Sequence, residues 1–397
     1  MHFQGGKIPE NEFFEGIVPL LFSSFMPNRP YSLLLFVFVL IASPGYAADS
    51  LPDRISNDTF VSLMQNLSEP SGSFLFENFV SNEPSYADLL RDLSKTTKPD
   101  GVYIGVGPEQ NFNYIAALHP KIAFTVDIRR QNMVEHLMYK ALFEMSPNRA
   151  DFLSRLFSRK RPAGLRDDST VQELMDAYMA APLDAESVQQ NLENIRVVLV
   201  LQRGFNISND DWAGLERIYK AFAEWGPRVN YSSDRNEFSS ARATAGNPSY
   251  VVEMNATDSD GRNWSYLSSE ASYRVVRDMQ LRNLIIPVVG DFAGPKAIRA
   301  VGQYLRDHSA PVTTFYVSNV ETYLFPGSNG QPMSGAPNGG WSHFIENVST
   351  LPINESSRFV RFLNVERPGR FDAMQQTIQA SRDGKIKAVR DLFPGPQ

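Results

Sequence analysis

Short apolar runs and stretches with helical spacing alternate along the chain between residues 100 and 320. Each run has the length of a buried strand, and the segments between the runs repeat apolar residues near the helical period. Strands that alternate with helices favour a mostly parallel sheet covered by helices on both faces. We therefore predict an α/β fold with a doubly wound, mostly parallel sheet. The runs are 102–106, 122–126, 197–201, 284–289 and 312–317.

The remaining patterns predict further helices, a hairpin and a late strand. A hairpin is expected from 250–257 and 262–267 across an Asp-Ser-Asp-Gly turn, and an edge strand over 359–365. Residues 149–194 have a wholly helical pattern, which predicts a helical insertion in the sheet domain. Helices are expected near 60–67, 85–93, 131–144, 210–225, 268–281, 295–306 and 371–382.

The N-terminus has the pattern of a targeting signal. Residues 31–42 form an apolar run of 12 residues that follows Arg29. Gly45 and Ala47 are small residues at the positions −3 and −1 that a signal peptidase recognises. This pattern predicts export to the periplasm or the cell exterior after cleavage following Ala47. An uncleaved membrane anchor is the alternative, and translation can begin at Met1 or at Met26.

These patterns divide the chain into successive parts. Residues 1–47 are the signal with its upstream extension, and 48–99 are a helical lead-in. Residues 100–325 form the α/β domain with its insertion at 149–194. Residues 326–397 add a loop, the edge strand and a helix to the same domain.

Composition excludes several functional classes. The net charge of −6 argues against nucleic-acid binding through a general basic surface. The chain has no cysteine, which excludes disulfides, thiolate catalysis and cysteine-based zinc sites. Its 5 histidines form no paired ligand motif, so no metal is expected. No serine hydrolase triad with a nucleophile elbow is present either.

Residues 100–144 organise the predicted domain. The first apolar run ends in a Gly-x-Gly turn at Gly105 and Gly107, a helix follows, and the second run ends at Asp127. Asp127 lies 20 residues after Gly107, where a ribose-binding acid is expected in a βαβ unit of this kind. Arg129 follows directly and can neutralise a carboxylate or phosphate. The pattern predicts a nucleoside-like ligand, although glycine turns and aspartates at strand ends also occur without a ligand.

Ligands of open α/β sheets bind beyond the carboxyl ends of the strands, so polar residues there are site candidates. Asp291, Asn319 and Glu321 are the candidate catalytic residues, although Asp291 can instead cap the helix that opens near Pro295. The predicted strand ends carry Gly105–Asn111, Asp127–Asn132, Gln202–Arg203, Asp291–Gly294 and Asn319–Glu321. The candidate cofactor-binding residues are Gly105, Gly107, Glu109, Asn111, Asp127 and Arg129.

At these positions the chain resembles the class I S-adenosylmethionine-dependent methyltransferases of the Rossmann-like superfamily, within a bacterial family whose first motif is altered. YIGVGPEQN stands where those enzymes have their glycine-rich motif, and FTVDIRRQN where they have an acid at the second strand. VVGDF and FYVSNVE extend the likeness to 280–325. The resemblance implies that Gly105 and Gly107 lie beside the methionine part of S-adenosylmethionine and that Asp127 binds its ribose.

Two positions depart from that family. Tyr103 replaces the usual acid before the first glycine, and Glu109 replaces the third glycine. S-adenosylmethionine is a cytoplasmic metabolite, so export conflicts with its use as a methyl donor.

Three hypotheses remain open from the sequence. The first is an exported protein that binds a nucleoside-like or other small molecule, without settled catalysis. The second is an active methyltransferase. The third is a scaffold protein that uses the insertion at 149–194. In each case we expect a membrane contact only through an uncleaved N-terminal segment.

Overall fold

The strands form one sheet with the order β3-β2-β1-β4-β5-β6. The first five run parallel, and β6 pairs antiparallel with β5. In this computed structural model the described residues are 50–74, 78–231, 247–326, 339–364 and 367–393. The strands are β1 Val102–Gly105, β2 Ile122–Asp127, β3 Ile285–Val289, β4 Val312–Ser318, β5 Ile353–Arg361 and β6 Arg370–Ala373. The predicted α/β class and the mostly parallel sheet are confirmed.

The central strands form because most of their residues are apolar on both faces. Every residue of β1, β2 and β3 is buried, as parallel strands covered by helices require. β1 lies between β2 and β4, with Val102 opposite both Ile122 and Val312. The strand order reverses at β1 and β4, which creates a crevice beyond their carboxyl ends.

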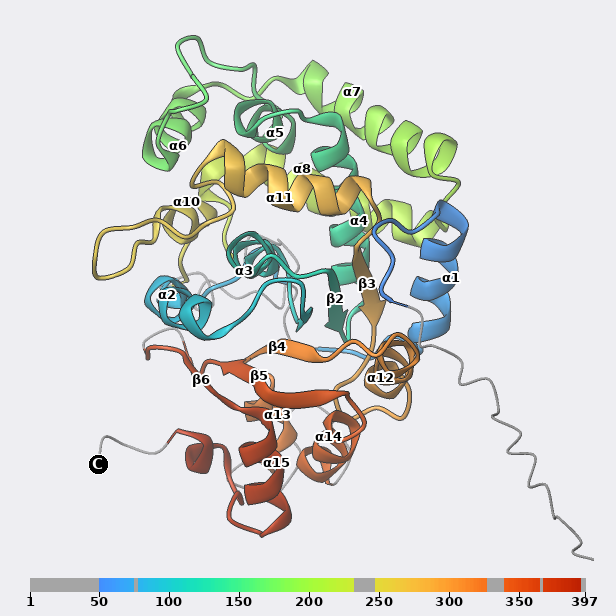
Figure 1. Ribbon diagram of the computed structural model, residues 1–397. Helices are drawn as coiled ribbons and strands as arrows, with labels where there is room; N and C mark the ends of the chain where they lie inside the picture. Colours follow the sequence, from blue (N-terminus) through green and yellow to red (C-terminus); the bar gives the residue numbers. More distant parts are fainter. Residues whose placement is uncertain (1–49, 75–77, 232–246, 327–338, 365–366, 394–397) are drawn as a thin grey trace, which may run out of the picture. The chain divides into compact units, whose positions relative to one another are not determined.

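Helices cover both faces of the sheet (Figure 1). One side carries α2 Tyr86–Thr96, α3 Gln110–Leu118 and α4 Arg130–Met145, and the other side carries α12 Ala297–Asp307, α14 Gly340–Val348 and α15 Met374–Arg382. α1 Asn57–Leu67 packs against β3 and α12. The short α13 Glu321–Leu324 follows β4, and a 3-10 turn, η4 Val389–Leu392, lies near the end of the described chain.

The chain between α4 and β3 forms a separate layer of helices, which packs on the far side of α4 from the sheet (Figure 1). Several of these helices begin at a capping side chain, as at Asn148, whose amide oxygen accepts a hydrogen bond from the Asp151 N–H at 2.8 Å. The layer contains α5 Arg149–Leu156, α6 Val171–Ala180, α7 Ala185–Arg196, η1 Val197–Gln202, α8 Asn209–Trp225, η2 Gly226–Arg228, α10 Tyr250–Asn255 and α11 Glu270–Leu281. The helical segment therefore continues well past the predicted boundary at residue 194.

Aromatic rings join this layer to the sheet domain. Phe112 of α3 packs edge-to-face against Tyr139 at 5.3 Å and Phe143 at 5.2 Å, both on α4. It also contacts Tyr266 at 5.5 Å, a residue of the loop before α11. Such ring pairs stabilise the contact beyond the area that they bury. The layer is thus part of the same hydrophobic core as α3 and α4.

The predicted strand at 197–201 is wrong. These residues continue α7 as one turn of π-helix, η1, in which Leu199 is fully buried and Leu201 is 75% exposed. A short apolar run fits a buried helix as well as a strand, and no glycine or proline separates this run from α7.

Two other predictions near strands need correction. The expected hairpin is wrong, because Tyr250–Asn255 is helical and 262–267 form no strand. The turn at 258–261 is present, and an isolated bridge between Thr257 and Asn263 flanks it. The predicted edge strand at 359–365 belongs to β5, which begins at Ile353 and has β4 and β6 on either side. The first part of β5 is polar, so apolar runs in the sequence do not indicate where this strand begins.

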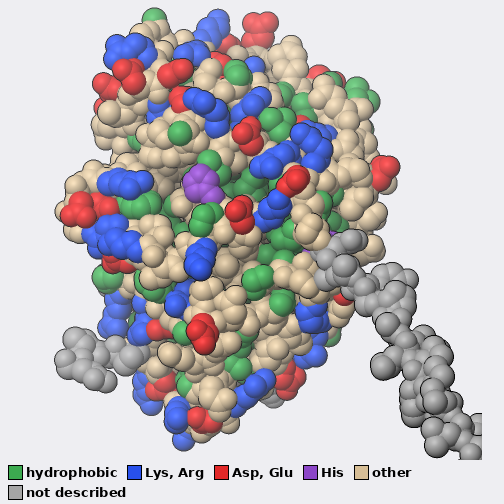
Figure 2. Space-filling model, in the orientation of Figure 1, with side chains coloured by type: hydrophobic (Ala, Val, Ile, Leu, Met, Phe, Trp, Pro, Cys, Tyr) green, Lys and Arg blue, Asp and Glu red, His purple; other side chains and the backbone are tan. Residues whose placement is uncertain are grey.

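The predicted signal and its apolar run at 31–42 lie outside the described residues. Within the described ranges, no helix is long and apolar enough to cross a membrane. Figure 2 shows cationic and anionic side chains intermixed over one face of the molecule.

Candidate functional site

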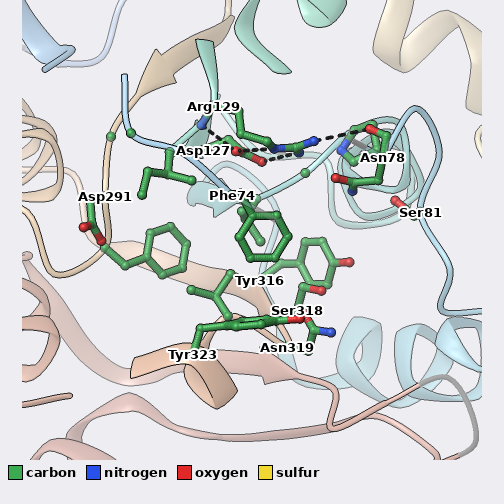
Figure 3. Close-up of a pocket in the computed structure, with 18 of the residues that line it drawn as sticks. Phe74, Asn78, Ser81, Asp127, Arg129, Asp291, Tyr316, Ser318, Asn319 and Tyr323 are labelled. Carbon is green, nitrogen blue, oxygen red and sulfur yellow. Dashed lines mark hydrogen bonds and ion pairs between the residues drawn. The ribbon is translucent and has the colours of Figure 1, made fainter. Parts of the chain in front are cut away.

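A cavity of about 350 Å³ opens beyond the carboxyl ends of β1, β2, β3 and β4. It lies at the switch point of the strand order, where open α/β sheets bind their ligands. The lead-in before β1 forms another part of its wall (Figure 3), and Tyr231 and residues of α13 also contribute. The lining comprises 72–74, 78, 81–83, 106–108, 127–129, Tyr231, 290–292, Tyr316, 318–320, Tyr323 and Leu324.

The glycine turn after β1 meets this cavity at Gly107. Its φ of 76° lies in the left-handed region, and no atom lies within 4 Å of the position a Cβ would take. Gly105 lies outside the lining, and a Cβ there would lie 2.0 Å from Asn111 Oδ1. Gly107 therefore presents its backbone to the cavity without a side chain, whereas Gly105 makes room for a neighbouring side chain.

Asn111 holds the turn from inside. Its amide nitrogen donates to the carbonyls of Val106 at 3.0 Å, Gly107 at 2.8 Å and Pro108 at 2.7 Å. Its oxygen accepts from the Tyr103 hydroxyl at 2.9 Å, and both side chains are buried. Asn111 and Tyr103 thus shape the turn and lie outside the cavity lining.

Glu109 and His136 support the same turn. The Glu109 carboxylate is fully buried and accepts from the Ser81 N–H at 3.1 Å, which ties the lead-in to the turn. Burial raises the pKa of Glu109 to about 8. Burial also lowers the pKa of His136 to about 4, so this neutral ring donates from Nε2 to the Gly107 carbonyl at 2.9 Å. Neither residue lines the cavity.

Asp127 and Arg129 lie together in the cavity wall (Figure 3). Asp127 Oδ1 accepts from the backbone N–H and Nε of Arg129 at 2.9 and 3.0 Å, and Oδ2 accepts from Nη2 at 2.8 Å. Arg129 extends above Phe74 toward the carbonyl of Asn78 at 3.5 Å (Figure 3). The pair is buried, so the carboxylate is held rigidly, and Oδ2 keeps acceptor capacity for a ligand.

Asp291 and Asn319 line the cavity. Asp291 Oδ1 accepts from the Ala293 N–H at 2.9 Å. The first turn of α12 is capped by Glu69 instead, which accepts from the N–H groups of Asp291 at 2.6 Å and Lys296 at 3.1 Å. Glu69 therefore holds the loop after β3 in place, a contact between distant segments that the sequence did not indicate.

Two predicted strand-end sites lie elsewhere. Glu321 is 2% exposed, lies outside the lining and accepts from Arg361 Nε and Nη2 at 2.7 and 3.0 Å. Arg203 follows the π-helical turn rather than a strand and forms an ion pair with Glu144 at 2.8 Å. These arrangements link structural elements and do not bring either residue to the cavity.

Sequence reasoning missed Glu83. This residue comes from the lead-in, is 3% exposed and lines the cavity beside the end of β4. Aromatic walls were missed as well: Phe74 packs edge-to-face against Tyr323 at 5.0 Å (Figure 3). Because the lead-in reaches the strand ends only through tertiary packing, no local sequence signal marks these residues.

Across the described ranges, no group of three or more histidine, aspartate or glutamate side chains is arranged to hold a metal ion. The search of curated proteins gave no match. A family model described as "Domain of unknown function (DUF7790)" matches residues 78–382, which include the whole sheet and most of the cavity wall. The chain therefore belongs to the DUF7790 family.

Proposed function

We propose that this protein binds a nucleoside-like small molecule in the cavity, with Asp127 accepting hydrogen bonds from the ribose hydroxyls. One observation carries the proposal: the Asp127 carboxylate lies at the end of β2, in the wall of a cavity at the switch point of the sheet. Gly107 in the same wall lets backbone approach the ligand without a Cβ.

The Arg129 contact favours neutral hydroxyl groups at this end of the cavity. Arg129 already neutralises the Asp127 charge through two side-chain hydrogen bonds, so little attraction remains for a cation. Oδ2, which accepts one of them, can still accept from a hydroxyl.

The remaining walls suit a planar ring. Phe74, Phe292 and Tyr323 line the cavity together with Ile128 and Val320. The volume of about 350 Å³ falls within the usual range for small-molecule sites. An apolar, aromatic cavity with a few fixed polar groups is the usual form of such a site.

Methyl transfer from S-adenosylmethionine is the second candidate, favoured by the strand order with its cavity at the switch point. The residues fit the nucleoside part of this molecule, which Asp127 and Gly107 would hold. When bound, S-adenosylmethionine supplies an electrophilic methyl group. The first candidate is preferred because the N-terminal signal pattern favours export, away from the cytoplasmic supply of this cofactor.

Calorimetric titration of adenosine and of S-adenosylmethionine into the full chain tests the proposal. We expect adenosine to bind, and Asp127→Asn to weaken it at least about tenfold through loss of a charged acceptor. The matched control is Asp211→Asn, because Asp211 forms a similar two-bond pair with Arg130, at 2.6 and 2.7 Å, outside this cavity.

Equal adenosine binding by the wild type and Asp127→Asn would refute the assigned role, as would binding lost equally in both variants. Binding of S-adenosylmethionine with no binding of adenosine would favour the second candidate. Cell fractionation tests export separately, because an exported protein is expected outside the cytoplasmic fraction.

A further inference from the structure

Glu83 places a second carboxylate in the cavity wall. It lies beside Tyr316 and Ser318 of β4, which in Figure 3 lie on the opposite side of Phe74 from Asp127 and Arg129. Glu83 is 3% exposed, so its charge is largely removed from bulk water. A carboxylate in such a position needs compensation.

Neutral groups supply all the hydrogen bonds that Glu83 receives from described side chains. Oε2 accepts from the Tyr316 hydroxyl at 2.5 Å and from Gln110 Nε2 at 3.2 Å, and Oε1 accepts from the Ser318 hydroxyl at 2.5 Å. Three donors directed at one carboxyl group favour its ionised form. In the part of the chain that the structure describes, no lysine or arginine forms an ion pair with Glu83.

The buried carboxylates that follow β2 and β4 differ in this respect, and Glu109, which also lacks a cation among the described residues, lies outside the cavity lining. Asp127 is paired with Arg129, and Glu321 with Arg361. Burial without a cation raises the pKa of Glu83 to about 7. The wall therefore contains a hydrogen-bonded but uncompensated carboxyl group that faces a cavity of ligand size.

We propose that Glu83 forms a subsite for the ammonium group of the bound ligand, so that the cavity takes small aromatic or nucleoside-like amines. This inference rests on the proposed function, because it concerns the same cavity. A cation here completes the pairing that buried charges require. Ser318 and Tyr316 give their hydroxyl hydrogens to Glu83 and keep lone pairs that can accept from the ammonium group.

The subsite suits a single ammonium group better than a metal ion. A divalent ion in an oxygen site needs several carboxylate or carbonyl ligands. Among the described residues, no cluster of three or more acidic or histidine side chains is arranged to hold such an ion. An ammonium group carries three donors and one charge, which matches one carboxylate with two hydroxyl oxygens. The two ends of the cavity thus select different groups: hydroxyls at Asp127 and an amine at Glu83.

Two matched ligand pairs test the subsite by calorimetry on the full chain. Tryptamine and tryptophol share an aromatic ring and chain and differ by ammonium against hydroxyl. Adenosine and its analogue with an amine in place of the primary hydroxyl form the second pair. In at least one pair we expect the amine to bind about tenfold more tightly than the neutral member near pH 8, or tighter still, because its contact with Glu83 is charge-assisted.

Glu83→Gln should reduce this preference, the ratio of the amine affinity to the affinity of the neutral member, to about threefold or less, and Glu83→Asp should restore part of it. Absence of the preference in both pairs, or its survival in Glu83→Gln, would overturn the proposal. Selective tryptamine binding without adenosine binding would count against the nucleoside proposal alone and would support the ammonium subsite.

The wild type alone provides an independent measurement if Glu83→Gln does not fold. Tryptamine affinity should fall as the pH drops below about 7, where Glu83 takes up a proton, while tryptophol affinity stays constant. A pH-independent preference would contradict the assignment. The neighbouring titratable groups are Tyr103, Tyr114, Tyr231, Tyr316 and Glu253, and burial raises the pKa of each of them. The four tyrosines, whose ordinary pKa is already 10, therefore stay neutral in this range.

Discussion

Replacing Asn111 with alanine removes the side chain that holds the turn after β1. The amide nitrogen donates to three carbonyls in this turn, and the oxygen accepts from the Tyr103 hydroxyl. Of these groups, the Gly107 carbonyl retains His136 as a partner. The carbonyls of Val106 and Pro108 and the buried Tyr103 hydroxyl each lose a contact.

The expected cost follows from these lost contacts. A buried polar group that loses its hydrogen bond costs about 1 kcal/mol or more, and three groups are affected. We therefore expect Asn111→Ala to lower the free energy of unfolding by about 3 kcal/mol. Because the turn forms part of the cavity wall, adenosine affinity should fall as well.

Urea unfolding followed by circular dichroism measures the first effect, and calorimetry the second. The control is Asn206→Ala, because Asn206 is exposed and its substitution should change stability by less than about 0.5 kcal/mol. If Asn111→Ala lost no more stability than this control, the turn would not depend on the amide, and the reasoning would be refuted.

Three further predictions concern the framework of the site. Arg361→Met should cost about 3 to 5 kcal/mol in urea unfolding, because it leaves the buried Glu321 carboxylate without its cation; a loss below about 1 kcal/mol would contradict this. Glu109 has a pKa of about 8 in the fold against an ordinary value of 4.5, so the native state keeps a proton that the unfolded chain releases. The free energy of unfolding should therefore fall as the pH rises from about 5 to 8, and Glu109→Gln should flatten this fall; an unchanged slope would argue against the buried proton. Gly107→Ala should cost about 1 kcal/mol for its left-handed backbone, whereas Gly105→Ala should cost more because its Cβ would collide with the Asn111 side chain; equal unfolding midpoints would contradict the contrast.

The sequence predicts the centre of the fold well because its signals are local. The apolar runs 102–106 and 122–126 are the strands β1 and β2, whose ends at Gly105 and Asp127 lie one residue from the predicted ends. The apolar run at 197–201 misleads because a short apolar run fits a turn of helix as well as a strand.

The site is only partly predictable, because tertiary contacts decide which strand-end residues face the cavity. Asp127, Asp291 and Asn319 line it as expected from their positions, whereas Glu321 turns away to pair with Arg361. Glu83 reaches the cavity from the lead-in, and the hydrogen bonds that mark it come from residues far along the chain. Such partners cannot be inferred from spacing in one sequence.

A crystal structure of the full chain grown with adenosine tests the central claim most directly. We predict density for the nucleoside in the cavity beyond β1 and β4, with a ribose hydroxyl within about 3 Å of the Asp127 carboxylate. Adenosine bound elsewhere, or in this cavity with its ribose away from Asp127, would contradict the account.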